Sequence, residues 1–89
     1  MKSSLIIKVE GRVQGVGFRY YTNQKALELG ISGFVKNLGD GSVYIEAEGE
    51  KEQMDLFVSW VKEGPEWARV EDVKTQENQN QDYKSFMVR

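Results

Sequence analysis

The chain has 89 residues and a net charge of −2, contains neither cysteine nor histidine, and includes four Phe, four Tyr and two Trp. This length fits one domain with one core, which we expect to span residues 1–89. The two missing residue types exclude disulfides, thiolate metal sites, a cysteine nucleophile, a phosphohistidine intermediate and the usual near-neutral general base. Any phosphate chemistry must therefore use other groups.

We expect a cytoplasmic protein, because the sequence shows no targeting signal and no membrane segment. The apolar run at residues 5–7 stops at Lys8, and no cleavage pattern of a secretory signal follows it. No stretch approaches the ~20 apolar residues of a membrane helix. The pI of the chain is near 5.1, whereas nucleic-acid-binding proteins usually carry a basic patch or stripe on their surface. We therefore expect neither a nucleic-acid nor a membrane partner.

The first third of the chain predicts a strand, a loop and a helix. Leu5, Ile7 and Val9 follow the period of two that is typical of a strand. Three glycines within residues 11–17 indicate a loop. From about Phe18 the apolar pattern changes to a helical spacing of four, four and three residues, carried by Phe18, Thr22, Ala26 and Leu29. This pattern predicts a helix that begins at the glycine loop and ends near residue 30.

The middle of the chain predicts a hairpin and a second helix. Residues 33–38 are β-prone, Asp40 and Gly41 form a turn signal, and apolar residues alternate along 43–48. Spacings of i, i+3, i+4 and i+7 then predict a helix that ends before residue 64. Four apolar residues carry this helical pattern: Met54, Phe57, Val58 and Val61.

The last third carries weaker signals. Val70 and Val73 are out of phase for strict alternation, so we expect a fourth strand with a bulge near Asp72. The polar tract 76–81 indicates a loop, and the apolar positions of residues 83–88 indicate a short edge strand. The sum is an α+β, split β-α-β arrangement, in which an antiparallel sheet of four to five strands carries two helices on one face.

The glycine-rich loop is a candidate anion site. A loop between a strand and a helix N-terminus can direct several backbone N–H groups into one concavity. Its spacing fits neither the Walker A pattern nor the dinucleotide fingerprint, and a tight turn also explains it. Arg19 favours the anion site, because a positive side chain in the first helical turn opposes the helix dipole and could bind a phosphoryl group. A solvated surface arginine is the alternative.

Asn37 is the second polar candidate. It lies near the end of the second strand, where its ordinary role would be turn formation. In a split β-α-β unit the first two strands are parallel with one strand between them, so their ends reach one sheet edge about 10 Å apart. The loop, Arg19 and Asn37 can therefore converge on one site.

Two other groups of residues are weaker candidates. Acidic residues at alternate positions indicate a solvated strand face rather than a cation site. These residues are Glu46, Glu48, Glu50 and Glu52. The aromatic pairs read as partial core or surface anchors rather than as base-stacking platforms: they are Tyr20 with Tyr21, and Trp60 with Trp67.

Two segments closely resemble the signatures of the acylphosphatase family. Residues 11–19 (GRVQGVGFR) resemble the first signature and residues 33–43 (GFVKNLGDGSV) the second, while residues 64–70 resemble the family's segment after its second helix. The resemblance therefore covers nearly all of the chain in colinear order. It implies a ferredoxin-like sandwich that hydrolyses acyl phosphates to a carboxylate and inorganic phosphate, without a metal or an organic cofactor.

The resemblance also implies roles for single residues. Arg19 would be the catalytic arginine that binds the transferred phosphoryl group, and Asn37 would position the attacking water through its side-chain amide. A phosphate oxygen would accept the proton of that water. The substrate-binding cradle would be formed by main-chain N–H groups of Gly15, Val16, Gly17, Phe18 and Arg19. The implied partners are a small acyl phosphate and inorganic phosphate, as product and inhibitor, and we expect a monomer.

The chemistry agrees with this implication, although other functions stay open. An acyl phosphate has a stable carboxylate leaving group, so positioning and electrostatics can suffice without a general acid. A non-catalytic anion-binding regulatory or accessory module would bind the anion without turnover. An RNA-recognition domain would need a basic surface around its central strands, whereas Tyr44 there has acidic neighbours. Departures from the common pattern at Glu10, Lys36 and the last residues bear on substrate preference and on the packing of the C-terminal strand, not on the reaction class.

Overall fold

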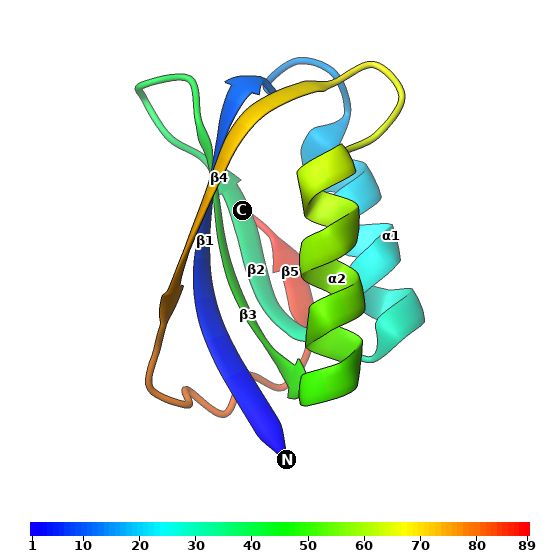
Figure 1. Ribbon diagram of the computed structural model, residues 1–89, viewed down its shortest axis with the longest axis vertical. Coiled ribbons are helices and arrows are strands. Elements are labelled where there is room, and N and C mark those ends of the chain that lie inside the picture. Colours follow the sequence, from blue (N-terminus) through cyan, green and yellow to red (C-terminus); the bar gives the residue numbers. More distant parts are fainter.

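Two helices lie side by side on one face of a five-stranded sheet (Figure 1). The computed structural model describes residues 1–89. The sheet has the strand order β4-β1-β3-β2-β5. In chain order the elements are β1 (Lys2–Arg12), α1 (Phe18–Leu29), β2 (Ser32–Asn37), β3 (Val43–Glu50), α2 (Lys51–Glu63), β4 (Arg69–Glu77) and β5 (Phe86–Val88). The split β-α-β arrangement predicted from the sequence is confirmed.

The central strands take their positions from the period-two pattern. Ile7 and Val9 of β1 and Ile45 of β3 have no exposed surface, because they face the helices. β3 pairs antiparallel with both β1 and β2. β1 and β2 consequently run parallel, and their carboxyl ends reach the same edge of the sheet, as predicted.

Both helices begin and end close to the predicted positions. α1 follows Gly17, whose φ of 80° is left-handed, and it ends at Gly30, where φ is 69°. Its buried face includes Phe18, Thr22 and Ala26. α2 buries three of the four predicted positions, namely Met54, Phe57 and Val61, and ends before residue 64. No helix in the structure has both the length and the apolar composition to cross a membrane.

The predicted bulge is present in β4. Glu10 lies opposite Asp72, whereas the next residue, Gly11, lies opposite Val70. Glu71 is therefore the extra residue. A Cβ atom at Gly11 would lie 2.2 Å from the carbonyl oxygen of Arg69, so only glycine allows this close approach of the two strands.

Two details of the last third differ from the sequence-based expectation. Gln76 and Glu77, which were expected in a loop, pair with Ile6 and Leu5 and extend β4. Main-chain pairing along the long β1 strand outweighs their low strand propensity. β5 is a short edge strand as expected, but it pairs parallel with β2, so the sheet is mixed. The chain reaches this edge by crossing the sheet at residues 78–85.

This crossing segment is held by two carboxylates that were wrongly expected to be solvated. Glu48 is only 5% exposed. It accepts hydrogen bonds from the main-chain N–H of Gln81, from that of Tyr83 at 3.1 Å, and from the Ser4 hydroxyl at 2.8 Å. Glu46 accepts the Tyr83 hydroxyl at 2.6 Å. These donors come from a distant part of the chain, which local alternation does not reveal.

The hydrogen bonds also set the protonation of the buried carboxylate. Burial acts to raise the pKa of Glu48, but the hydrogen bonds from Gln81, Ser4 and Tyr83 together lower this pKa below its ordinary value. Burial and the neighbouring Glu46 carboxylate raise the pKa of Tyr83 to about 12, so this phenol stays a donor at neutral pH. The ionised form of Glu48 therefore stabilises the folded chain.

Replacing Glu48 tests this stabilisation. Glu48→Gln places an amide N–H₂ group against hydrogen-bond donors, so we expect the free energy of unfolding at pH 7 to fall by about 1–3 kcal/mol in urea denaturation. Because the folded-state pKa of Glu48 is depressed, its contribution is complete above the unfolded-state pKa and is lost as pH falls through the folded-state pKa. The difference between wild type and variant should therefore shrink below about pH 4.

Glu77→Gln is the matched control. Glu77 is exposed at the end of β4, and its carboxylate makes no hydrogen bond or ion pair. This variant should unfold within about 0.5 kcal/mol of the wild type at both pH values. An equal effect of the two substitutions would contradict the role of Glu48.

Candidate active site

The loop between β1 and α1 has the geometry of an anion cradle. Gly15 and Gly17 have φ values of 74° and 80°, a left-handed conformation that turns successive N–H groups to one side. No side chain caps the N-terminus of α1, and its first turn contains no acidic residue. The first N–H groups of the helix therefore remain available to an anion, and the helix dipole adds partial positive charge there.

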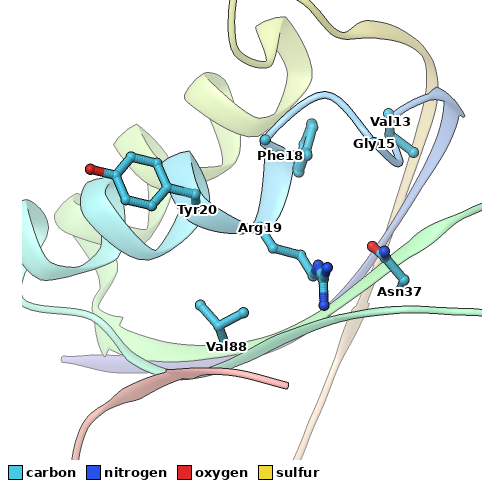
Figure 2. Close-up of a pocket in the computed structure, with 8 residues that line it drawn as sticks. Val13, Gly15, Phe18, Arg19, Tyr20, Asn37 and Val88 are labelled. Atoms are coloured by element: carbon cyan, nitrogen blue, oxygen red, sulfur yellow. The ribbon is translucent and has the colours of Figure 1, made fainter.

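A cavity of about 300 Å³ opens at this helix terminus. Arg19 reaches it from the first turn of α1 and Asn37 from the end of β2, and their side-chain ends lie next to one another (Figure 2). The eight lining residues are Val13, Gly15, Gly17, Phe18, Arg19, Tyr20, Asn37 and Val88. The structure thus brings together the loop, the arginine and the asparagine that the sequence indicated.

The lining differs from the sequence-based expectation at a few positions. Val16 does not line the cavity, and its side chain packs against the hydrophobic core. Val13, Tyr20 and Val88 line it without having been expected to. Val13 lies within the glycine loop and Tyr20 lies three residues after it, so their positions could have been inferred. Val88 belongs to β5, and its place at the cavity follows from the parallel pairing with β2.

Arg19 is oriented by the end of the chain. Its Nη1 donates a hydrogen bond of 3.0 Å to the main-chain oxygen of Arg89. Arg89 is itself fixed, because its N–H donates to the carbonyl oxygen of Val35 at 2.8 Å and its guanidinium lies 4.0 Å from the centre of the Phe34 ring. One side of the Arg19 guanidinium is thereby engaged with protein, and its other donors remain available to a ligand.

Asn37 contributes a polar atom without a protein partner. It pairs with Val43 as the last residue of β2, so the sheet fixes its backbone. Its side-chain Oδ1 is buried, yet accepts no hydrogen bond. A buried acceptor without a donor is unfavourable, so the site favours a small molecule that can donate a hydrogen bond to this oxygen.

The hairpin that carries Asn37 has a well-fixed turn. Asp40 accepts the Ser42 N–H at 3.0 Å and the Ser42 hydroxyl at 2.5 Å, and it forms an ion pair of 3.0 Å with Lys8. The two hydrogen bonds from Ser42, with a smaller effect of Lys8, hold the pKa of Asp40 well below its usual range. Asp40 is therefore ionised at neutral pH, and its contacts with Ser42 and Lys8 stabilise the turn.

Together these features describe a site for a phosphoryl-sized anion and one small polar molecule. The cradle N–H groups and Arg19 supply positive potential, and Asn37 supplies a free hydrogen-bond acceptor beside it. The described side chains include no cluster of three or more metal-binding groups. An anion and a water molecule would lie next to one another here, which is the arrangement that hydrolysis of a phosphate compound requires.

Comparisons with known proteins agree with this arrangement. Residues 5–88 match the family model described as Acylphosphatase. Among curated proteins, an acylphosphatase of Archaeoglobus fulgidus is 53% identical over 96% of this chain and 96% of its own length. An acylphosphatase of Thermus thermophilus is 50% identical over 94% of this chain and 96% of its own length.

A solved structure shows the same fold. The acylphosphatase from Coxiella burnetii superposes with a TM-score of 0.95 at 40% identity, over 99% of this chain and 93% of that chain. The family match extends from β1 into β5, and therefore includes the glycine loop, Arg19, Asn37 and Val88. Sequence, fold and site thus agree that this chain belongs to the acylphosphatase family.

Proposed function

We propose that this protein hydrolyses the carboxyl-phosphate bond of small acyl phosphates, with Arg19 and Asn37 as its catalytic residues. The observation that carries this proposal is the shared cavity, in which the Arg19 guanidinium and the unpartnered Oδ1 of Asn37 meet beside the N-terminus of α1. The products are a carboxylate and inorganic phosphate. Membership of the acylphosphatase family supports the same reaction.

The cradle and Arg19 bind the phosphoryl group. Main-chain N–H groups of residues 15–19 direct partial positive charge toward the non-bridging oxygens, and Arg19 adds a full charge through charge-assisted hydrogen bonds. In a loose transition state the negative charge is spread over these oxygens. Donors that are already oriented stabilise that charge without reorganisation, which lowers the barrier.

Asn37 orients the nucleophile. A water molecule that donates a hydrogen bond to Oδ1 of Asn37 directs its lone pair at the phosphorus atom. Arg19 holds this atom in place by binding the phosphoryl oxygens. The water oxygen forms a bond to phosphorus while the bond to the acyl oxygen breaks, and that electron pair leaves on the carboxylate. The proton of the water passes to a phosphoryl oxygen, so neither a histidine nor a general acid is needed.

We also propose that the enzyme acts in the cytoplasm as a single-domain monomer of residues 1–89, without a metal, an organic cofactor, nucleic acid or a membrane as partner. The absence of cysteine and the acidic pI of about 5.1 support this part of the proposal. The stable carboxylate leaving group supports chemistry that needs no metal.

Turnover of a generic substrate tests the reaction. Purified protein should hydrolyse benzoyl phosphate in the presence of EDTA, because the site uses only its own charges. Inorganic phosphate should inhibit competitively, because it occupies the same cradle. The assay follows the loss of benzoyl phosphate absorbance. Protein that binds phosphate but does not turn over the substrate would instead be a non-catalytic anion-binding module.

Two alanine variants separate the proposed roles. Arg19→Ala should weaken phosphate binding and lower kcat, because charge-assisted hydrogen bonds contribute about 1.5–3 kcal/mol. Asn37→Ala should lower kcat by about 10²–10³-fold with little change in KM, because a water-orienting group acts mainly in the transition state. Steady-state kinetics and phosphate inhibition constants measure both effects.

The control for these variants is Arg69→Ala, which removes an exposed arginine on β4. It should retain the kinetics of the wild type. Full turnover by Asn37→Ala would refute the role assigned to that residue, and an unchanged phosphate inhibition constant in Arg19→Ala would refute binding by the arginine.

A further inference from the structure

Gln14 joins the two halves of the site without lining its cavity. It lies in the loop between β1 and α1, directly before Gly15. Its Nε2 donates one hydrogen bond to the carbonyl oxygen of Leu38 and one to that of Ser42, each 2.8 Å long. A side-chain amide has two N–H donors, so both are used. Gln14 is not among the residues that line the cavity.

The two acceptors form the base of the β2–β3 turn. The Leu38 N–H donates to the carbonyl oxygen of Ser42 at 2.9 Å, which closes the turn. Leu38 directly follows Asn37 in the chain. Gln14 therefore binds the base of the turn, directly after the position at which Asn37 ends β2 and lines the cavity.

This contact is the only hydrogen-bonded connection between loop residues 13–17 and turn residues 38–42. The nearby ion pair between Lys8 and Asp40 joins the turn to β1 instead. Pairing of the strands fixes the hairpin only as far as Asn37 and Val43. Core packing of Val13 and Val16 anchors the loop, and Gln14 is the side chain that hydrogen-bonds it directly to the turn.

We infer that Gln14 is a positioning residue, which sets the separation between the phosphate cradle and the water-orienting amide of Asn37. This inference rests on the proposed function. An amide suits the role because it donates twice to neutral carbonyl groups and adds no charge beside the anion site. A carboxylate could not donate to these carbonyl groups, and an ammonium group would add a competing cation.

The role has a distinct kinetic signature. Loss of the two hydrogen bonds leaves the cradle N–H groups and Arg19 in place, so inorganic phosphate should still bind. The attack geometry should worsen, because the water bound at Asn37 is no longer held in line with phosphorus. Misplacement by about 1 Å can cost on the order of 10²-fold in rate. A residue with a purely structural role would lower stability without this split between rate and binding.

Gln14→Met provides the test, since methionine keeps the length of the side chain but cannot donate. We expect kcat for benzoyl phosphate to fall by about 10-fold or more, while the inhibition constant of inorganic phosphate changes by less than about 3-fold. Gln53→Met, in the first turn of α2 and outside the cavity lining, is the matched control and should keep wild-type kinetics. Gln14→Asn, which is one methylene shorter but retains both donors, repeats the test if the methionine variant does not fold.

A double-mutant cycle identifies the partner through which Gln14 acts. In an Asn37→Ala background, Gln14→Met should lower kcat by less than about 2-fold, because the group that it positions is already absent. The inference would be overturned if the effects of Gln14→Met and Asn37→Ala on kcat multiplied in the double variant. It would also be overturned if the Gln14 variants lost phosphate affinity as much as they lost kcat, or if they kept the kcat of the wild type. A wild-type protein that does not hydrolyse benzoyl phosphate would overturn the proposed function itself, which distinguishes the two failures.

Discussion

The antiparallel pairing of β3 with both of its neighbours determines where the site forms. Val43 pairs with Val9 on one side and with Asn37 on the other, so these three residues form one row across the sheet. The glycine loop therefore begins just beyond the same row in which Asn37 ends β2. A slip of one residue would expose the fully buried side chains of Ile7 and Ile45, so the hydrophobic core fixes this register.

Local patterns were sufficient to predict most of the elements and the centre of the site. The period of two identified β1 and β3, the helical spacing identified α2, and glycine residues marked both ends of α1. Arg19 was conspicuous because its charge opposes the helix dipole. Asn37 was placed by topology, since the two parallel strands of a split β-α-β unit must end at one edge.

Features that depend on residues 78–89, which cross the sheet after β4 and form β5, could not be predicted from local patterns. Glu48 belongs to an alternating pattern that is typical of a solvated strand, but its donors lie 33 and 35 residues later, at Gln81 and Tyr83. The same holds for Val88, which lines the cavity, and for Arg89, which binds Arg19, because both take their positions from the parallel pairing of β5 with β2. In each case a polar or terminal segment takes its position from distant hydrogen bonds rather than from local periodicity.

The shortness of β5 has a consequence for local opening. The strand spans three residues, and Phe86 is its only buried side chain. Segments with few buried contacts open at a lower free energy than the core, so the β5 amides should exchange with solvent ahead of those in β1 and β3. Such an opening would release the Arg19 guanidinium from the main-chain oxygen of Arg89 while the rest of the sheet stays intact. The order of the cavity is therefore coupled to the shortest strand of the fold.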